Sequence, residues 1–362
     1  MKRPTLVNFL SILTEDFLSI RASITLTTRP KALSDSPPSP IQAIKLLKGE
    51  AFAIKIIGLD QDRKEIFKKI YESDSFGNFL LKIPINESRK NIRVLQIYEV
   101  KKRDGLDLHL GSFLPIKIKS LSKIVISDFD KTLVDTRYST TKELYKSLTS
   151  PIEVFPTIKE SVELMLNFIA EGHHPFILSA SPHFYEDAIR DWLYKREIFT
   201  AGIFLKDYRE VFSLFQGQLT PKDLKIQGLY KLNHLLDILL MTGLPNELVL
   251  MGDNFESDPV IYSALSLLLQ EKTPAWSLWK KMKQNEKFQL TKRQNAQVLN
   301  KIYQIESSIE NIKAQNGGQY NPKVQIYIRK KANEPSPNLP GIFYPGDSIV
   351  HLYDGKTSLS PA

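Results

Sequence analysis

The sequence predicts an α/β fold in which a parallel sheet with helices on both faces follows a small antiparallel β-sandwich domain. Two observations lead to this prediction. Short strands with a period of two residues fill positions 46–120, and from residue 121 apolar strands alternate with helical segments. The chain has 362 residues, which is enough for about two domains of ordinary size.

The N-terminal part of the chain is expected to contain an arm and then the β domain. Residues 1–45 form the arm and linker in this interpretation, because they end in "SDSPPSP", a run of Ser and Pro. The β domain is expected at 46–120. Its segments "FAIKIIGL", "NFLLKIPI" and "IRVLQIYEV" are rich in branched and aromatic residues and are separated by turn clusters.

The larger domain is expected at 121–330, and five apolar segments in it predict parallel strands. These are residues 124–127, 175–179, 202–205, 248–251 and 324–328. A helical insertion is expected at about 263–320, because apolar residues recur there at steps of three and four. They are Val298, Ile302, Ile305, Ile309 and Ile312. Residues 331–362, rich in Pro and Gly, are expected to form a tail on the surface.

Composition narrows the classes of function. The chain contains no cysteine, which excludes disulfides, zinc–thiolate sites and thiol catalysis. The formal net charge of +9 favours an anionic partner such as a membrane surface, a nucleic acid or a phosphorylated molecule. Glu15 and Asp16 interrupt the apolar start of the chain, so we expect a cytoplasmic protein without a signal peptide.

Polar side chains follow the predicted strands, at the edge where ligands bind in an open parallel sheet. The first strand of the larger domain ends in two acids spaced one residue apart, Asp128 and Asp130. Ser179 and Ser181 lie at the end of the second strand. Lys231 precedes the fourth strand, and Asp253 and Asp258 follow it.

These residue types suit phosphoryl chemistry. Two like charges at ~4 Å repel by on the order of 4 kcal/mol at an effective dielectric near 20, so gathered carboxylates need a hard cation such as Mg²⁺. A carboxylate can attack a phosphoryl group, and a second one can protonate the leaving oxygen. Ser179 and Lys231 have the hydroxyl and ammonium groups that can hold phosphoryl oxygens.

The sequence also resembles a known superfamily. "DFDKT", the Ser in "ILSAS", Lys231 and "GDNFESD" resemble the four motifs of haloacid-dehalogenase-type phosphatases, in their usual order and spacing. The resemblance implies that Asp128 is the nucleophile, Asp130 the general acid/base and Ser179 a phosphoryl ligand. The Mg²⁺ ligands that it implies are Asp128, the backbone carbonyl of Asp130, and Asp253, with Asp258 in support. Lys231 would neutralise charge, and Lys222 and Lys225 are the alternatives for that role.

A finer resemblance concerns one family of these enzymes. "ISDFDKTLVDT", "SASP", "GDNFESDPVIY" and "VQIYIRK" are similar to the phosphatidate phosphatase family first known from cortical actin patches, in which a small β domain also precedes the catalytic one. The resemblance covers about 46–330. The helical insertion departs from the family pattern, as do Lys131, His183 and Asn254, which stand where the family usually has Asp, Trp and a small hydroxyl residue.

The expected function is therefore that of a Mg²⁺-dependent phosphomonoesterase that forms an aspartyl phosphate and converts phosphatidate to diacylglycerol and phosphate. Ser181 and His183 are the expected substrate contacts. In "WSLWKKMKQNEKF" Trp276 and Trp279 accompany lysines, which suits a peripheral contact with an anionic membrane. In the alternative interpretation, Trp279 and Met282 pack on the sheet and the lysines are solvated. No nucleic-acid partner is expected.

Two other functions fit parts of the same evidence. The first is the same chemistry on a soluble or macromolecular phosphomonoester. The second is a phosphatidate-binding module without turnover, and the presence of both Asp128 and Asp130 argues against it, because a binder gains nothing from acids that face a dianion.

Overall fold

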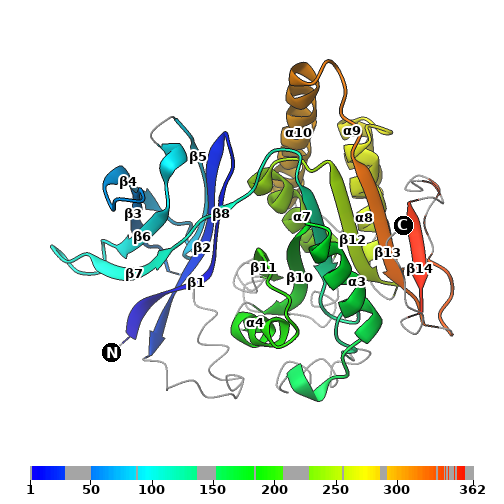
Figure 1. Ribbon diagram of the computed structural model, residues 1–362, viewed down its shortest axis with the longest axis horizontal. Coiled ribbons are helices and arrows are strands. Elements are labelled where there is room, and N and C mark those ends of the chain that lie inside the picture. The colour runs from blue at the N-terminus through cyan, green and yellow to red at the C-terminus, as the bar shows by residue number, and fades with distance from the viewer. Residues whose placement is uncertain are drawn as a thin grey trace. The chain divides into compact units, whose positions relative to one another are not determined.

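The computed structural model describes the chain over several ranges. They are residues 2–28, 50–86, 89–136, 152–182, 185–206, 228–254, 257–285, 292–331, 333–337, 339, 341, 346 and 349–354. Contacts divide the chain into two units, the first built mainly from Met1–Ser120 and the second mainly from Leu121–Ser181, Ala188–Lys206 and Leu219–Ala362 (Figure 1).

The first unit is a β-sandwich of two four-stranded sheets, as predicted. One sheet has the order β5-β2-β1-β8 and the other the order β4-β3-β6-β7. The strands are β1 Lys2–Leu13, β2 Phe17–Thr28, β3 Ala53–Leu59, β4 Glu65–Glu72, β5 Asn78–Pro84, β6 Val94–Glu99, β7 Leu108–Phe113 and β8 Ile116–Lys117, with a short 3₁₀ helix η1 at Arg89–Asn91.

The core of the sandwich follows the alternation of its strands. Ile54 and Ile56 of β3 are fully buried, whereas Lys55 between them is only partly covered. Ile20 and Ile24 of β2 belong to the same core cluster, so residues of both sheets meet there. Burial of each such side chain contributes roughly 1.5–3 kcal/mol.

The prediction of an N-terminal arm at 1–45 is wrong for its first part. Strands β1 and β2 pair antiparallel over 12 residues each, and β2 also pairs with β5. Small polar residues such as Ser19 and Thr25 are buried on the face of β2 opposite the core, which obscures the alternation of apolar and polar residues. Glu15 and Asp16 lie in the turn of this hairpin. The predicted linker falls largely on residues 29–49, which lie outside the described residues.

The second unit contains a six-stranded parallel sheet with the order β11-β10-β9-β12-β13-β14, flanked by helices. The strands are β9 Lys123–Asp128, β10 His174–Pro182, β11 Gly202–Lys206, β12 Glu247–Asp253, β13 Lys323–Arg329 and β14 Val350–Tyr353. All five predicted strands are confirmed, because each lies within one of the first five of these. Consecutive residues of β9 and of β12 are buried, and they are apolar until the last two positions of each strand. Such continuous apolar runs are typical of strands covered on both faces.

The helices of this unit include those of the predicted insertion. The described helices are α3 Lys159–Ala170, α4 Glu186–Tyr194, α7 Gly228–Thr242, α8 Asp258–Leu269, α9 Ala275–Gln284 and α10 Lys292–Gln315, with the 3₁₀ helix η2 at Ile152–Val154. The apolar stripe of α10 is confirmed, because Val298, Ile302, Ile305 and Ile309 are all buried. Among the residues that the structure describes, no helix combines the length and apolar character needed to cross a bilayer.

The predicted surface tail is corrected at one point. Strand β14, within 331–362, adds a parallel edge strand to β13, with Ile326 opposite Val350. The hydroxyl of Tyr353 lies 2.8 Å from the hydroxyl of Ser161 on α3, and both residues are buried. The short apolar run of β14 stands between Pro- and Gly-rich stretches, which hid it in the composition of the tail.

Candidate active site

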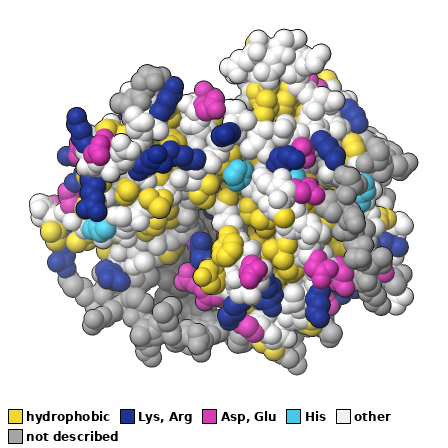
Figure 2. All heavy atoms as spheres, viewed as in Figure 1, with side chains coloured by type: hydrophobic (Ala, Val, Ile, Leu, Met, Phe, Trp, Pro, Cys, Tyr) yellow, Lys and Arg dark blue, Asp and Glu magenta, His cyan; other side chains and the backbone are white. Residues whose placement is uncertain are grey.

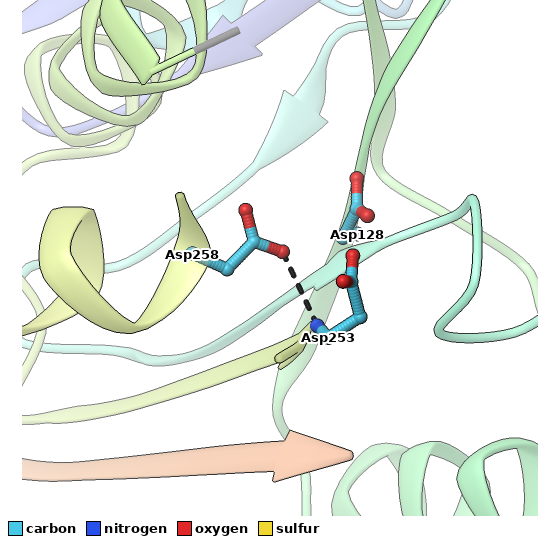
Figure 3. A group of neighbouring side chains, drawn as sticks. All are labelled: Asp128, Asp253 and Asp258. Atoms are coloured by element: carbon cyan, nitrogen blue, oxygen red, sulfur yellow. Dashed lines mark hydrogen bonds between the residues drawn. The ribbon is translucent and has the colours of Figure 1, made fainter. Parts of the chain in front are cut away.

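Three aspartates meet at the carboxyl ends of two neighbouring strands. Asp128 is the last residue of β9, Asp253 the last residue of β12, and Asp258 the first residue of α8. Because β9 and β12 pair in parallel, with Met251 opposite Ser127, their ends lie at the same edge of the sheet. All three side chains are buried, one carboxylate oxygen from each lies within 4.8 Å of the others, and they converge as Figure 3 shows.

The approach of α8 to the strand end depends on Gly252. A Cβ atom at this position would lie 2.5 Å from Oδ2 of Asp258 and 2.7 Å from Cε2 of Tyr262, and these distances leave no room for a side chain. The backbone N–H of Asp253 donates to Oδ2 of Asp258 at 3.3 Å (Figure 3). The glycine therefore allows the first residue of α8 to dock against β12.

Lys231 on α7 is the cation of this cluster. Its side chain is fully buried, with Nζ 2.5 Å from Oδ1 of Asp258 and 3.2 Å from Oδ1 of Asp128. Charges taken out of water need partners of the opposite sign, and this ammonium pairs with two of the three clustered carboxylates, those of Asp128 and Asp258. The excess of negative charge and the all-oxygen donor set suit a hard divalent cation. The alternatives Lys222 and Lys225 lie outside the described residues.

Asp130 has different surroundings from the three clustered acids. Its Oδ2 accepts a hydrogen bond from Oγ of Ser179 at 2.8 Å and a long one from Oγ of Ser181 at 3.5 Å. Its Oδ1 accepts from Oγ1 of Thr136 at 3.2 Å. The backbone N–H of Ser181 in turn donates to Oγ of Ser179, which orients that hydroxyl. The predicted acid/base and the predicted phosphoryl ligand are thus brought together.

A tight turn after β9 carries Asp130 and returns the chain to Thr136. Lys131 has a φ of 59°, in the left-handed region that residues with a Cβ seldom adopt. Its backbone N–H donates to the carbonyl of Val134 at 2.7 Å, and the N–H of Val134 donates to Phe129. These bonds fold the turn back on itself, and the carboxylate of Asp130 thereby contacts the hydroxyls of Ser179 and Thr136.

The predicted substrate contact His183 lies outside the described residues. Asn254, which follows Asp253, donates from Nδ2 to the carbonyl of Pro335 at 2.8 Å and from its backbone N–H to the carbonyl of Arg329 at 3.0 Å. Asn254 therefore holds the segment after β13 against the end of β12.

Three further residues support the site and were not predicted from the sequence. Thr136 contacts Asp130, and Arg329 donates from Nη1 to the carbonyl of Lys131 at 2.8 Å. The hydroxyl of Tyr262 donates to the carbonyl of Met251 at 3.1 Å. Burial, with the nearby carboxylate of Asp258, holds the pKa of Tyr262 well above its usual value, so it stays a neutral donor. All three lie within segments that resemble the family, Thr136 in "ISDFDKTLVDT", Tyr262 in "GDNFESDPVIY" and Arg329 in "VQIYIRK", but the resemblance assigns none of them a role.

Comparison with solved structures gives no likeness that bears on this site. A β-glucuronidase from Parabacteroides merdae, solved with glycerol in its active site, has 11% identity and a TM-score of 0.24, over 90% of this chain and 34% of that one. β-Glucuronidase 2 from Bacteroides uniformis, covalently bound to cyclophellitol-6-carboxylate aziridine, has 11% identity and a TM-score of 0.25, over 90% and 33%. The chain spans about a third of the length of these enzymes. TM-scores this low do not indicate a shared fold or a shared function.

Comparison with families is informative. A search of curated proteins found no match. The family model described as "Phosphatidate phosphatase APP1, catalytic domain" matches residues 123–306, which begin at β9 and include every described residue of the carboxylate cluster. The matched residues make up half of the chain. The chain therefore belongs to the family of phosphatidate phosphatase APP1 catalytic domains.

Proposed function

We propose that this protein is a Mg²⁺-dependent phosphomonoesterase that converts phosphatidate to diacylglycerol and phosphate. The observation that supports the proposal most is the buried cluster of Asp128, Asp253 and Asp258 with Lys231 among them, in a chain of the phosphatidate phosphatase family. Buried acids that face one another do not stabilise a fold by themselves, so their arrangement calls for a function.

The residues fit a magnesium ion. Asp128, Asp253 and Asp258 would hold it, together with the carbonyl oxygen of Asp130 that the family resemblance implies, and all of these donors are oxygen atoms. When bound, Mg²⁺ supplies positive charge to the phosphoryl oxygens and lowers their repulsion of the carboxylates.

The two acids of the first motif would share the reaction. In the first step a carboxylate oxygen of Asp128 attacks phosphorus, the bond from phosphorus to the glyceryl oxygen breaks, and Asp130 donates a proton to that oxygen. In the second step Asp130 takes a proton from water, the water oxygen attacks phosphorus, and the bond to Asp128 breaks. Inorganic phosphate leaves, and both acids return to their first state.

The hydroxyls around Asp130 support these roles. Ser179 donates to Asp130 at 2.8 Å and lies on the strand next to β9, so a small rotation of its hydroxyl would direct the proton to a phosphoryl oxygen instead. Ser181 is partly exposed and would contact the substrate farther from the reacting bond. Lys231 would hold Asp128 in place and reduce the negative charge around the attacked phosphorus.

The choice of a lipid substrate and of a cytoplasmic, peripheral location rests on charge and on helix α9. Trp276 on α9 is 52% exposed and stacks on Trp279, with ring centroids 5.1 Å apart. Lys280 and Lys283 are exposed on the same helix. Trp279 and Met282 of this helix are buried, so Trp276 is the aromatic side chain offered to a surface. An exposed aromatic side chain with lysines around it suits an anionic lipid surface, where each lysine contributes roughly 1 kcal/mol. Lys and Arg side chains also gather over β3, β4 and β6 in Figure 2.

The experiment that tests the function compares two substrates. Phosphate release with Mg²⁺ is measured from phosphatidate in mixed micelles and from a soluble aryl phosphate, each with and without a chelator. We expect preference for the lipid and loss of activity in chelator. Activity on the aryl phosphate alone would support the chemistry but contradict the lipid substrate. Full activity in chelator would refute the metal site.

A further inference from the structure

Arg329 ends β13 and contacts the turn that carries Asp130. From Nη1 it donates to the carbonyl oxygen of Lys131 at 2.8 Å, and the side chain is only 11% exposed. β13 lies beside β12, and β12 beside β9, so this contact reaches from the end of β13 past β12 to the turn after β9. The residue lies beyond positions 123–306, which the family model matches.

The contact falls on the most constrained point of the turn. Lys131 directly follows Asp130 and has the left-handed φ of 59°. Its N–H is held by the carbonyl of Val134 and its carbonyl by Arg329, so the peptides on both sides of this residue are fixed. A change in either peptide rotates the backbone of Asp130 and moves its carboxylate.

Arg329 also contacts the other end of the turn. Nη1 lies 3.4 Å from Oδ1 of Asp135, which precedes Thr136, and Thr136 donates to the carboxylate of Asp130. The exposed Lys331 pairs with the same Asp135 oxygen at 3.0 Å. Arg329 thus joins Lys131, which follows Asp130, to Asp135, which precedes the hydroxyl donor Thr136. The ammonium of Lys331 contacts Asp135.

The backbone of Arg329 links this turn to the metal-binding strand. Its carbonyl accepts the N–H of Asn254, which follows Asp253 at the end of β12. One residue therefore holds the segment after Asp253 through its backbone and the segment after Asp130 through its side chain.

We propose that Arg329 is a positioning residue that holds Asp130 at the distance and angle needed for proton transfer. The inference rests on the function proposed above, in which Asp130 protonates the leaving oxygen. Asp130 also takes a proton from water in the second step, but only in the first step does the need for its proton depend on the leaving oxygen of the substrate. A substrate with a strongly basic leaving oxygen needs this proton, and a substrate with a weakly basic one does not.

The leaving group therefore distinguishes positioning from general stabilisation. A water-soluble short-chain phosphatidate has an alkyl leaving oxygen, which is a strong base, and 4-nitrophenyl phosphate has a weakly basic one. For Arg329→Met, which keeps the length of the side chain and removes its donors, we expect kcat/KM to fall about tenfold further on the short-chain phosphatidate than on the aryl phosphate. Arg329→Lys, which keeps one donor, should recover part of this difference.

The matched control is Lys331→Met, which removes the other cation beside Asp135 and leaves the Lys131 carbonyl bonded. We expect it to keep the wild-type ratio of the two substrates. If Arg329→Met and Arg329→Lys lower both values of kcat/KM by the same factor, the positioning role is refuted while the proposed function stands. If wild-type protein with Mg²⁺ hydrolyses neither substrate, the proposed function is refuted and this inference with it.

Discussion

Ser179 donates a hydrogen bond to the carboxylate of Asp130 across 2.8 Å, although 49 positions separate the two residues in the sequence. β10 lies beside β9 in the sheet, with Leu178 opposite Asp128, and this register places Ser179 next to the turn that follows β9. The bond gives Asp130 hydroxyl partners, while Asp128 has the ammonium of Lys231 at 3.2 Å. Two acids spaced one residue apart thus have different surroundings, as distinct roles in one reaction require.

Ser179→Ala is expected to lower kcat/KM on phosphatidate by on the order of 10². The variant removes a direct donor to Asp130 and the hydroxyl proposed to hold a phosphoryl oxygen. Ser181→Ala is the matched control, because its hydroxyl lies at 3.5 Å from the same carboxylate oxygen and should matter several-fold less. Steady-state phosphate release measures both, and equal losses for the two variants would contradict the assignment.

Lys231→Met is expected to destabilise the protein and to make its stability depend strongly on Mg²⁺. Removal of the ammonium exposes Asp128 and Asp258 to each other's charge in a buried site, which costs on the order of 3–5 kcal/mol. Binding of Mg²⁺ should return part of this loss by mass action. Urea unfolding with and without Mg²⁺ measures the effect.

A lysine far from the cluster provides the control for this prediction. Lys301 on α10 pairs with the buried Asp237 on α7 at 2.6 Å. Lys301→Met should also lower the free energy of unfolding. Addition of Mg²⁺ should raise this free energy by no more in Lys301→Met than in the wild-type protein. An equal response of the two variants to Mg²⁺ would argue that Lys231 is an ordinary structural ion-pair residue.

Gly252→Ala is expected to weaken Mg²⁺ binding. The added Cβ would lie 2.5 Å from Oδ2 of Asp258, so the start of α8 must move away from β12 and carry that carboxylate with it. Overpacking of this kind costs typically about 1–3 kcal/mol of stability. Isothermal titration calorimetry reports the Mg²⁺ affinity of the folded variant, and an unchanged affinity would show that Asp258 does not contribute to the metal site.

The stability of the second unit is expected to fall as the pH drops below about 6.5. Burial lowers the pKa of His173 despite the Phe168 carbonyl and Glu247 nearby, and burial also lowers the pKa of His174. A histidine with a lowered pKa in the folded state binds its proton more readily when unfolded. Its contribution is therefore fully present above the unfolded pKa near 6.5 and is lost as the pH falls toward the folded value.

Unfolding free energies measured between pH 7.5 and 5 test this dependence. His173→Asn should make the pH dependence shallower, because it removes one of three described histidines in this unit, with His174 and His351, whose pKa is lowered by burial. His109→Asn, at an exposed position on β7, serves as the control and should leave the slope unchanged. A slope that is the same in all three proteins would show that His173 does not couple folding to pH.

The sequence predicted five of the six strands of the parallel sheet, because each of these five contains a short apolar run whose polar residues begin where the strand ends. It also identified the acids, since "DFDKT" and "GDNFESD" set their spacing along the chain. The N-terminal hairpin was missed, because Ser19 and Thr25 are buried and hide the alternation of β2. Burial of small polar residues is a property of the folded sheet, and the local sequence does not show it.

The supporting residues of the site could not be predicted for a related reason. Thr136 reaches Asp130 only because the turn after β9 folds back through the left-handed Lys131. Arg329 reaches that turn only because β13 lies in the same sheet, two places from β9. Both contacts depend on the path of the backbone in space, which no spacing of residue types along the chain encodes.

The most direct test of the central claim is phosphate release from phosphatidate, with Mg²⁺, by wild-type protein and by Asp128→Asn. Asparagine keeps the size of the side chain but cannot form the aspartyl phosphate, so we expect turnover by the wild-type protein and a loss of at least about 10³-fold in the variant. Circular dichroism should show the same fold for both proteins. Turnover by Asp128→Asn at a rate close to that of the wild-type protein would contradict the claim that Asp128 is the nucleophile.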